Sequence, residues 1–134
     1  MANKQEGKLR VAVIGTGNMG RNHVRNYFML PESELVAIAD VNPEAKSLAD
    51  DYKAKFFTDY KEMLEEVRPD AVSVVVPTPF HLEVAMDVMS RGIHCMLEKP
   101  IASSVEEADK LIACAKKNNV TFTVGHIERF NPVI

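Results

Sequence analysis

Short, almost continuous runs of hydrophobic residues recur along the chain, with longer amphipathic segments between them. The longer runs lack the polar alternation of a half-exposed strand, which is typical of strands covered on both faces. We therefore read them as buried strands of a parallel sheet. The six runs are Leu9–Ile14, Leu35–Ala39, Phe56–Phe57, Ala71–Val76, Ile93–Leu97 and Thr121–Val124.

The segments between these runs carry helix signals. Asn42 and Asp59 each precede an amphipathic stretch and are good N-caps, and the helix after Asp59 must stop before Pro69. A further helix follows Thr78 and ends near Gly92, because glycine readily takes the left-handed conformation that terminates helices.

A capping box is predicted for the last helix. Ser103 and Glu106 have the three-residue spacing at which a hydroxyl and a carboxylate each accept from a backbone N–H group of the first turn. Hydrophobic positions at helical spacing predict its buried face. These positions are Val105, Ala108, Leu111, Ile112 and Ala115.

A glycine-rich turn, Gly15-Thr16-Gly17-Asn18-Met19-Gly20, joins the first strand to the first helix. In a dinucleotide site, Gly15 permits the tight turn, Gly17 lets backbone amides approach a pyrophosphate, and Gly20 lets the helix pack closely. The helix N-terminus then faces the anion. A glycine triplet alone is weak evidence, but a strand before it and a helix after it are the context that this motif requires.

Asp40 follows the second strand, twenty residues beyond Gly20. An acid at this position accepts hydrogen bonds from both hydroxyls of the adenosine ribose. Its charge also repels a 2′-phosphate. The sequence therefore predicts NAD as cofactor in preference to NADP.

Strand and helix alternate from end to end, and right-handed crossovers then require a mostly parallel sheet with helices on both faces. With a glycine turn after the first strand, the expected fold is a doubly wound α/β Rossmann sheet of strand order 3-2-1-4-5-6. Ligand is expected over the carboxyl ends of the strands.

Two polar clusters follow the fourth and fifth strands, across the switch point from the glycine turn. They are Pro77-Thr78-Pro79-Phe80-His81 and Glu98-Lys99-Pro100. We expect Pro77, Thr78, His81 and Glu98 to contact the cofactor, although a histidine in a first helical turn is often only solvated or locally hydrogen-bonded. His23 and His94 are read as structural.

Lys99 is the predicted catalytic residue. Hydride transfer from an alcohol requires a group that takes the hydroxyl proton, and in the reverse direction a cation stabilises the developing alkoxide. Taken alone, Glu98-Lys99-Pro100 could equally be a charged turn between strand and helix. Its place after the fifth strand favours the catalytic reading.

Composition narrows the function classes. The 134 residues are 46% hydrophobic and 26% charged with a formal net charge of −3, which suits one ordinary globular domain and gives no footprint for nucleic acid. No hydrophobic run reaches the roughly twenty residues that cross a bilayer, so we expect no membrane association and a cytoplasmic location. Cys95 and Cys114 are read as packing residues, and no metal site is predicted.

The motifs together resemble the glucose–fructose oxidoreductase/inositol dehydrogenase/rhizopine-catabolism (Gfo/Idh/MocA) family of oxidoreductases. The resemblance rests on the glycine turn, Asp40, Thr78-Pro79 followed by His81, and Glu98-Lys99-Pro100. It implies an NAD-dependent sugar dehydrogenase in which Lys99 is catalytic or binds substrate.

The resemblance also implies a second domain that carries the substrate site. We expect residues 1–8 to be a flexible lead-in, 9–125 the dinucleotide-binding domain, and 126–134 the start of a connection to a substrate domain that this chain lacks. The chain would then be a truncated product with little turnover, and the full-length form a homo-oligomer. The tail is similar to that of members acting on nucleotide sugars, where Arg129 would suit an anionic small-molecule substrate.

Two other interpretations stay open. One is a free-standing NAD-binding or redox-sensing module, in which Glu98 and Lys99 serve the cofactor or the fold. The other is a dehydrogenase of different substrate specificity, because a cofactor domain contributes little to the choice of substrate.

Overall fold

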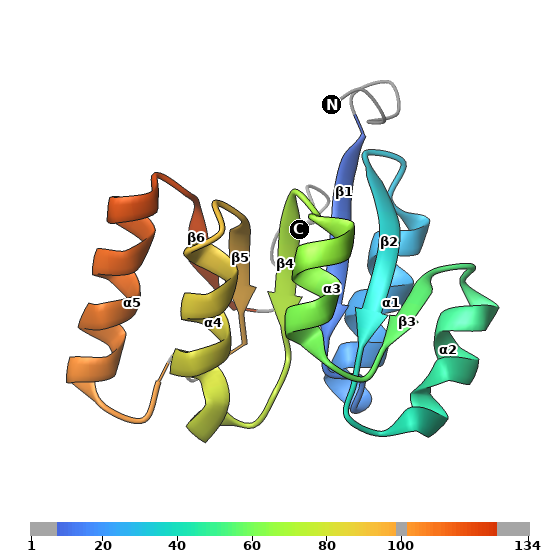
Figure 1. Ribbon diagram of the computed structural model, residues 1–134, viewed down its shortest axis with the longest axis horizontal. Helices are drawn as coiled ribbons and strands as arrows, with labels where there is room; N and C mark the ends of the chain where they lie inside the picture. Colours follow the sequence, from blue (N-terminus) through green and yellow to red (C-terminus); the bar gives the residue numbers. More distant parts are fainter. Residues whose placement is uncertain (1–7, 99–101, 126–134) are drawn as a thin grey trace.

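The computed structural model describes residues 8–98 and 102–125, which form one parallel sheet flanked by helices (Figure 1). The strand order β3-β2-β1-β4-β5-β6 confirms the predicted doubly wound sheet. The strands are β1 (Leu9–Ile14), β2 (Ser33–Ala39), β3 (Lys55–Phe57), β4 (Ala71–Val74), β5 (His94–Leu97) and β6 (Phe122–Val124).

The helices cover the sheet in two layers (Figure 1). They are α1 (Asn18–Met29), α2 (Lys46–Asp51), α3 (Tyr60–Val67), α4 (His81–Met89) and α5 (Val105–Asn118), with single 3-10 turns at Pro43–Ala45 and Thr78–Phe80. Helices α3, α4 and α5 pack on one face and α1 and α2 on the other. None of these described helices is long and apolar enough to span a membrane.

Alternation along β1 divides the core between the two layers. Ala12 and Ile14 belong to the cluster beneath α3, α4 and α5, whereas Val13 packs with Val24 of α1. The three β1 residues are at most 4% exposed, which is the burial expected of a central parallel strand. The continuous hydrophobic run that predicted this strand thus serves two cores at once.

Most of the predicted helix boundaries are confirmed. The Asn42 side chain accepts from the Glu44 N–H group at 3.0 Å, and Asp59 accepts from the N–H of Lys61 at 2.9 Å. Helix α3 ends at a left-handed Arg68, just before Pro69. Gly92 has a φ of +77° in the turn after α4.

The predicted start of the last helix is wrong by one residue. Ser104, not Ser103, is the N-cap, and its hydroxyl accepts from the N–H of Glu107 at 3.2 Å. The Glu107 carboxylate in turn accepts from the Ser103 N–H group at 3.1 Å. The predicted buried face is also partly wrong, because Val105 is 77% exposed and Ile112 is 44% exposed. The buried residues of α5 are Leu111, Cys114 and Ala115.

Both cysteines are buried, as predicted for packing residues. Burial raises the pKa of the Cys95 thiol to about 12, with a smaller contribution from Cys114. A thiol held protonated in this way is a poor nucleophile.

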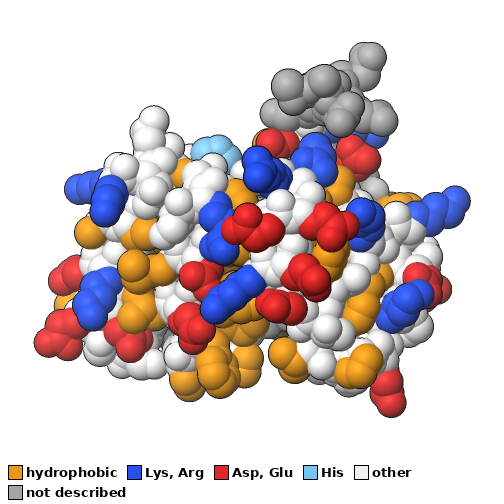
Figure 2. Space-filling view, viewed as in Figure 1, with side chains coloured by type: hydrophobic (Ala, Val, Ile, Leu, Met, Phe, Trp, Pro, Cys, Tyr) orange, Lys and Arg blue, Asp and Glu red, His pale blue; other side chains and the backbone are white. Residues whose placement is uncertain are grey.

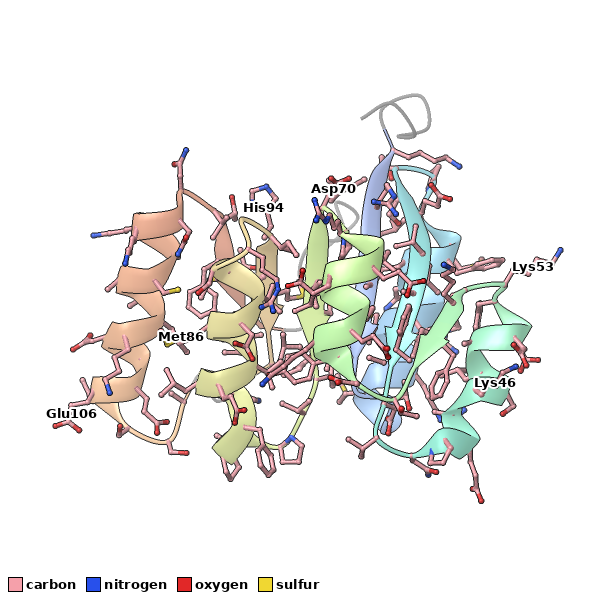
Figure 3. All side chains as sticks on the ribbon, viewed as in Figure 1. Lys46, Lys53, Asp70, Met86, His94 and Glu106 are labelled. Carbon is pink, nitrogen blue, oxygen red and sulfur yellow. The ribbon has the colours of Figure 1, made fainter. Side chains whose placement is uncertain are left out.

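His94 lies at the amino ends of the strands, on the same edge as Asp70 (Figure 3). Its Nδ1 accepts from the N–H of Thr121 at 2.9 Å, which ties the start of β5 to the loop before β6. This contact agrees with the structural role predicted for His94.

Candidate functional site

A cleft of about 760 Å³ opens at the carboxyl ends of β1, β2 and β4. The carboxyl ends of these strands point to the lower side of Figures 1 and 2, and hydrophobic side chains gather along that side beneath α3 and α4 (Figure 2). Elements distant in sequence supply its walls. The lining residues are Ile14, Gly15, Thr16, Gly17, Met19, Ala39, Asp40, Val41, Thr58, Tyr60, Val75, Val76, Pro77, Phe80, Glu83 and Val84.

The glycine turn is anchored to the strands on either side of it. The Gly15 N–H donates to the carbonyl of Ala39, and the N–H of Val75 donates to the Ile14 carbonyl, each at 2.8 Å. Gly15 has a φ of +98°, and a Cβ there would lie 2.2 Å from the Val75 carbonyl oxygen. The turn therefore requires glycine for its backbone conformation and for its contact with the loop after β4.

Gly20 is required by packing within the motif. A Cβ on Gly20 would lie 2.0 Å from the carbonyl oxygen of Gly15, so the first turn of α1 rests directly on the turn that precedes it. The close approach predicted at Gly20 is therefore present, but α1 approaches the glycine turn more closely than it approaches the sheet.

Gly17 differs from these two glycines. It is the N-cap of α1 with an extended backbone, φ −67° and ψ −166°, which other residues can adopt. A Cβ added to it would meet nothing within 4 Å. Neither conformation nor contact within the described part of the chain requires glycine here. The open space in front of Gly17 is what a ligand touching the backbone would need.

The first turn of α1 can bind an anion. Asn18 is its first residue, and the turn contains no acidic residue to compete for the N–H groups. Gly17 and Met19 both line the cleft. The positive end of the helix dipole and its unpaired N–H groups therefore face the same space as Gly17.

Asp40 is held by the glycine turn itself. Its Oδ2 accepts from the Thr16 N–H at 2.8 Å and from the Thr16 hydroxyl at 2.5 Å, and its Oδ1 accepts from the N–H of Asn42 at 2.8 Å. Burial alone would raise the pKa of Asp40, but these hydrogen bonds outweigh it and lower the pKa. Asp40 is therefore a fixed carboxylate that keeps acceptor capacity on Oδ1 for a further donor.

Sequence reasoning did not identify the hydrophobic wall of the cleft. Val41 is 88% exposed and Phe80 is 53% exposed, and with Val76 they present an unusual apolar surface to solvent. Such a wall suits a flat aromatic group such as a nucleobase. The predicted fourth strand, Ala71–Val76, is two residues too long, because β4 ends at Val74 and Val76 lies in the loop beyond it.

The loop after β4 contributes only part of what was predicted. Pro77 lines the cleft, whereas Thr78 and His81 are not among its described lining residues. His81 is 1% exposed, and its Nε2–H donates to the carbonyl of Val76 at 2.9 Å. Of the two ordinary roles considered for His81, the local hydrogen bond is the one found and solvation is excluded by burial. The predicted contacts of Thr78 and His81 with the cofactor stay predictions.

Glu98 lies at the carboxyl end of β5 but turns toward α1. It is 8% exposed, and its Oε2 is 2.6 Å from Nε2 of His23, a residue with 0% exposure. Its position as a cofactor contact stays a prediction. Lys99 and Arg129 lie outside the described residues.

The chain matches the model of the GFO_IDH_MocA family, described as an oxidoreductase family with an NAD-binding Rossmann fold, over residues 9–126. It is 39% identical over 127 residues to UDP-N-acetylglucosamine 3-dehydrogenase of Acidithiobacillus ferrooxidans, which covers 94% of this chain and 39% of that protein. The solved structure of that dehydrogenase superposes with a TM-score of 0.83 over 95% of this chain and 41% of its own.

A second solved structure is similar in fold. Scyllo-inositol dehydrogenase of Lactobacillus casei, with bound NAD(H) and scyllo-inositol, gives a TM-score of 0.85 at 25% identity, over 93% of this chain and 38% of that chain. The chain thus spans less than half the length of these relatives.

Proposed function

The chain belongs to the Gfo/Idh/MocA oxidoreductase family, and on this basis we propose that it binds NAD across its glycine turn as the cofactor domain of a sugar dehydrogenase. Residues 9–125 form this domain, and residues 126–134 lead toward a substrate domain. The bound nicotinamide supplies or accepts the hydride.

The observation that carries the proposal is the open space at Gly17. A Cβ on Gly15 or on Gly20 would lie within 2.2 Å of a backbone atom, whereas a Cβ on Gly17 would have no neighbour within 4 Å. A pyrophosphate on the N–H groups at the start of α1 accounts for a glycine that the described chain does not need.

Replacing Gly17 with alanine is expected to weaken NADH binding about tenfold, because a methyl group keeps the pyrophosphate from charge-assisted hydrogen bonds. The free energy of unfolding should fall by about 1 kcal/mol or less, the cost of a poorer N-cap. Fluorescence titration with NADH and urea unfolding measure the two effects. Unchanged NADH affinity in a folded Gly17→Ala variant would contradict the proposal.

We further propose that the cleft prefers NAD to NADP. The ionised Asp40 carboxylate receives the adenosine ribose on Oδ1, and Glu83 adds a second negative charge to the cleft wall. A 2′-phosphate placed against Asp40 would meet repulsion in a partly buried site, where charges are poorly screened.

The Asp40→Asn variant is expected to reduce the preference for NADH over NADPH about tenfold, because it removes the charge and keeps the shape. Separate titrations with the two cofactors measure the ratio of dissociation constants. Asp51→Asn, an exposed change at the end of α2, is the matched control for net charge. An Asp40→Asn variant with the wild-type ratio would refute the electrostatic basis of this preference.

The proposed substrate is a sugar or nucleotide sugar whose hydroxyl is oxidised or whose ketone is reduced. The names of the relatives support this class. Lys99, two residues after β5 ends, takes or returns the substrate proton. Arg129 binds an anionic group of the substrate, such as a phosphate.

A further inference from the structure

Four polar side chains, Glu98, His23, Ser73 and Tyr27, are hydrogen-bonded in series in the interior between α1 and the sheet. Glu98 Oε2 is 2.6 Å from His23 Nε2, and His23 Nδ1 is 3.0 Å from Ser73 Oγ. Ser73 Oγ is in turn 2.5 Å from the hydroxyl of Tyr27. His23 and Ser73 are 0% exposed, so these groups satisfy one another and not water.

The hydrogen-bond chain has one consistent direction when Glu98 is ionised and the imidazole is neutral. The Tyr27 hydroxyl then donates to Ser73, and Ser73 donates to Nδ1 of His23. The Nε2–H of His23 donates to the Glu98 carboxylate. Every hydroxyl and ring N–H has an acceptor, and burial raises the pKa of Tyr27, which keeps its proton available for donation.

The location of these four hydrogen-bonded side chains is informative. In the strand order β2-β1-β4-β5, Asp40 follows β2 and Glu98 follows β5, three strand spacings away, or about 14 Å. The glycine turn lies between them. A dinucleotide that has its ribose at Asp40 and its pyrophosphate at the glycine turn extends toward the end of β5.

A buried carboxylate is costly unless it is paired, and hydrophobic residues usually fill such a position at lower cost. In the core on the α1 side of the sheet, β1 and β2 contribute Val13, Leu35 and Ile38. An ionisable side chain at Glu98, buried where a hydrophobic residue would cost less, therefore calls for a role beyond packing.

We propose that His23, oriented by Ser73 and Tyr27, is a positioning residue that fixes the Glu98 carboxylate beneath the nicotinamide end of the cleft, where its charge favours the oxidised cofactor. Oxidised nicotinamide is positively charged and the reduced ring is neutral, so a fixed negative charge stabilises only the former. The inference rests on the proposed NAD binding.

The test compares dissociation constants for NAD⁺ and NADH by titration calorimetry. Glu98→Gln can still accept the His23 hydrogen bond but has no charge, so the ratio Kd(NAD⁺)/Kd(NADH) is expected to rise roughly fivefold to tenfold. Glu66→Gln is the control. Glu66 is an exposed residue of α3 that pairs with Lys55, and its replacement should leave the ratio unchanged.

Variants of His23 separate positioning from packing. His23→Gln keeps an N–H donor for Glu98 and should retain the wild-type ratio, whereas His23→Leu should shift it as Glu98→Gln does. If circular dichroism shows that His23→Leu does not fold, Ser73→Ala takes its place in the test. Ser73→Ala removes the hydroxyl donor that selects the imidazole tautomer. We expect it to shift the ratio in the same direction, but by less.

The outcomes are distinguishable. Binding of neither cofactor form by the wild-type chain would reject the proposed function. Binding of both forms, with a ratio that Glu98→Gln leaves unchanged, would overturn the inference and leave NAD binding intact. ¹⁵N NMR of the imidazole gives an independent check. A His23 protonated only on Nδ1 would overturn the inference, and so would one protonated on both nitrogens, because the pair with Glu98 would then carry no net charge.

Discussion

Replacing Gly15 with alanine is expected to lower the free energy of unfolding by about 4 kcal/mol or to prevent folding. Two costs add at this position. A φ of +98° strains any side chain, and a Cβ would lie 2.2 Å from the Val75 carbonyl oxygen. Val75 cannot move away easily, because its own N–H is bonded to the Ile14 carbonyl at 2.8 Å. Such a loss is a large share of the stability of a typical domain.

Gly92→Ala is the matched control for this prediction. Gly92 also has a positive φ, +77°, but a Cβ there meets nothing within 4 Å. The Gly92→Ala variant should therefore lose only the free energy of the conformational strain, about 1–2 kcal/mol. Urea unfolding followed by circular dichroism measures both variants. Equal losses at Gly15 and Gly92 would show that the contact with Val75 contributes nothing.

Replacing Lys99 with methionine is expected to lower kcat by roughly 10²–10⁴-fold, the usual contribution of a general acid or base. The affinity for NADH should change little, because the proposed pyrophosphate and ribose contacts are made by the glycine turn and by Asp40. The measurement is steady-state sugar oxidation by a protein in which this domain is joined to the proposed substrate domain. Methionine keeps the length of the side chain and removes its proton-transfer group.

Two comparisons make the result specific to Lys99. Lys110→Met, on the exposed face of α5, removes a lysine without approaching the cleft and should leave kcat unchanged. Lys99→Arg keeps the charge but cannot act as a base at neutral pH, so it should remain impaired. Wild-type turnover in Lys99→Met would show that Lys99 does not transfer the substrate proton, and would favour the interpretation of Glu98-Lys99-Pro100 as a charged turn.

The hydrogen bonds of Asp40 connect the proposed cofactor preference to the shape of the glycine turn. Because Thr16 donates to Asp40 through both its N–H and its hydroxyl, the acid is oriented before any ligand arrives. Pre-orientation of this kind reduces the conformational cost of binding. In the proposed complex, Thr16 acts on the ribose through Asp40, a role that motif spacing alone does not indicate.

Local chemistry explains which features the sequence predicted correctly. Continuous hydrophobic runs and caps such as Asn42 and Asp59 reflect the preferences of a few neighbouring residues, and the strand order follows from crossover handedness. The capping box was misplaced because Ser103 and Ser104 are adjacent, and each has an acid three residues later. Local spacing does not distinguish the two registers.

By itself, the sequence determined that this chain is a doubly wound sheet with a glycine turn at its first crossover, because periodicity and glycine spacing are properties of the continuous chain. Only the tertiary structure decided that Gly17 faces open space while Gly15 and Gly20 do not, and that His23 meets Glu98. Those two side chains are 75 residues apart in sequence. Contacts between such distant residues depend on how helix and strand pack, which no local pattern encodes.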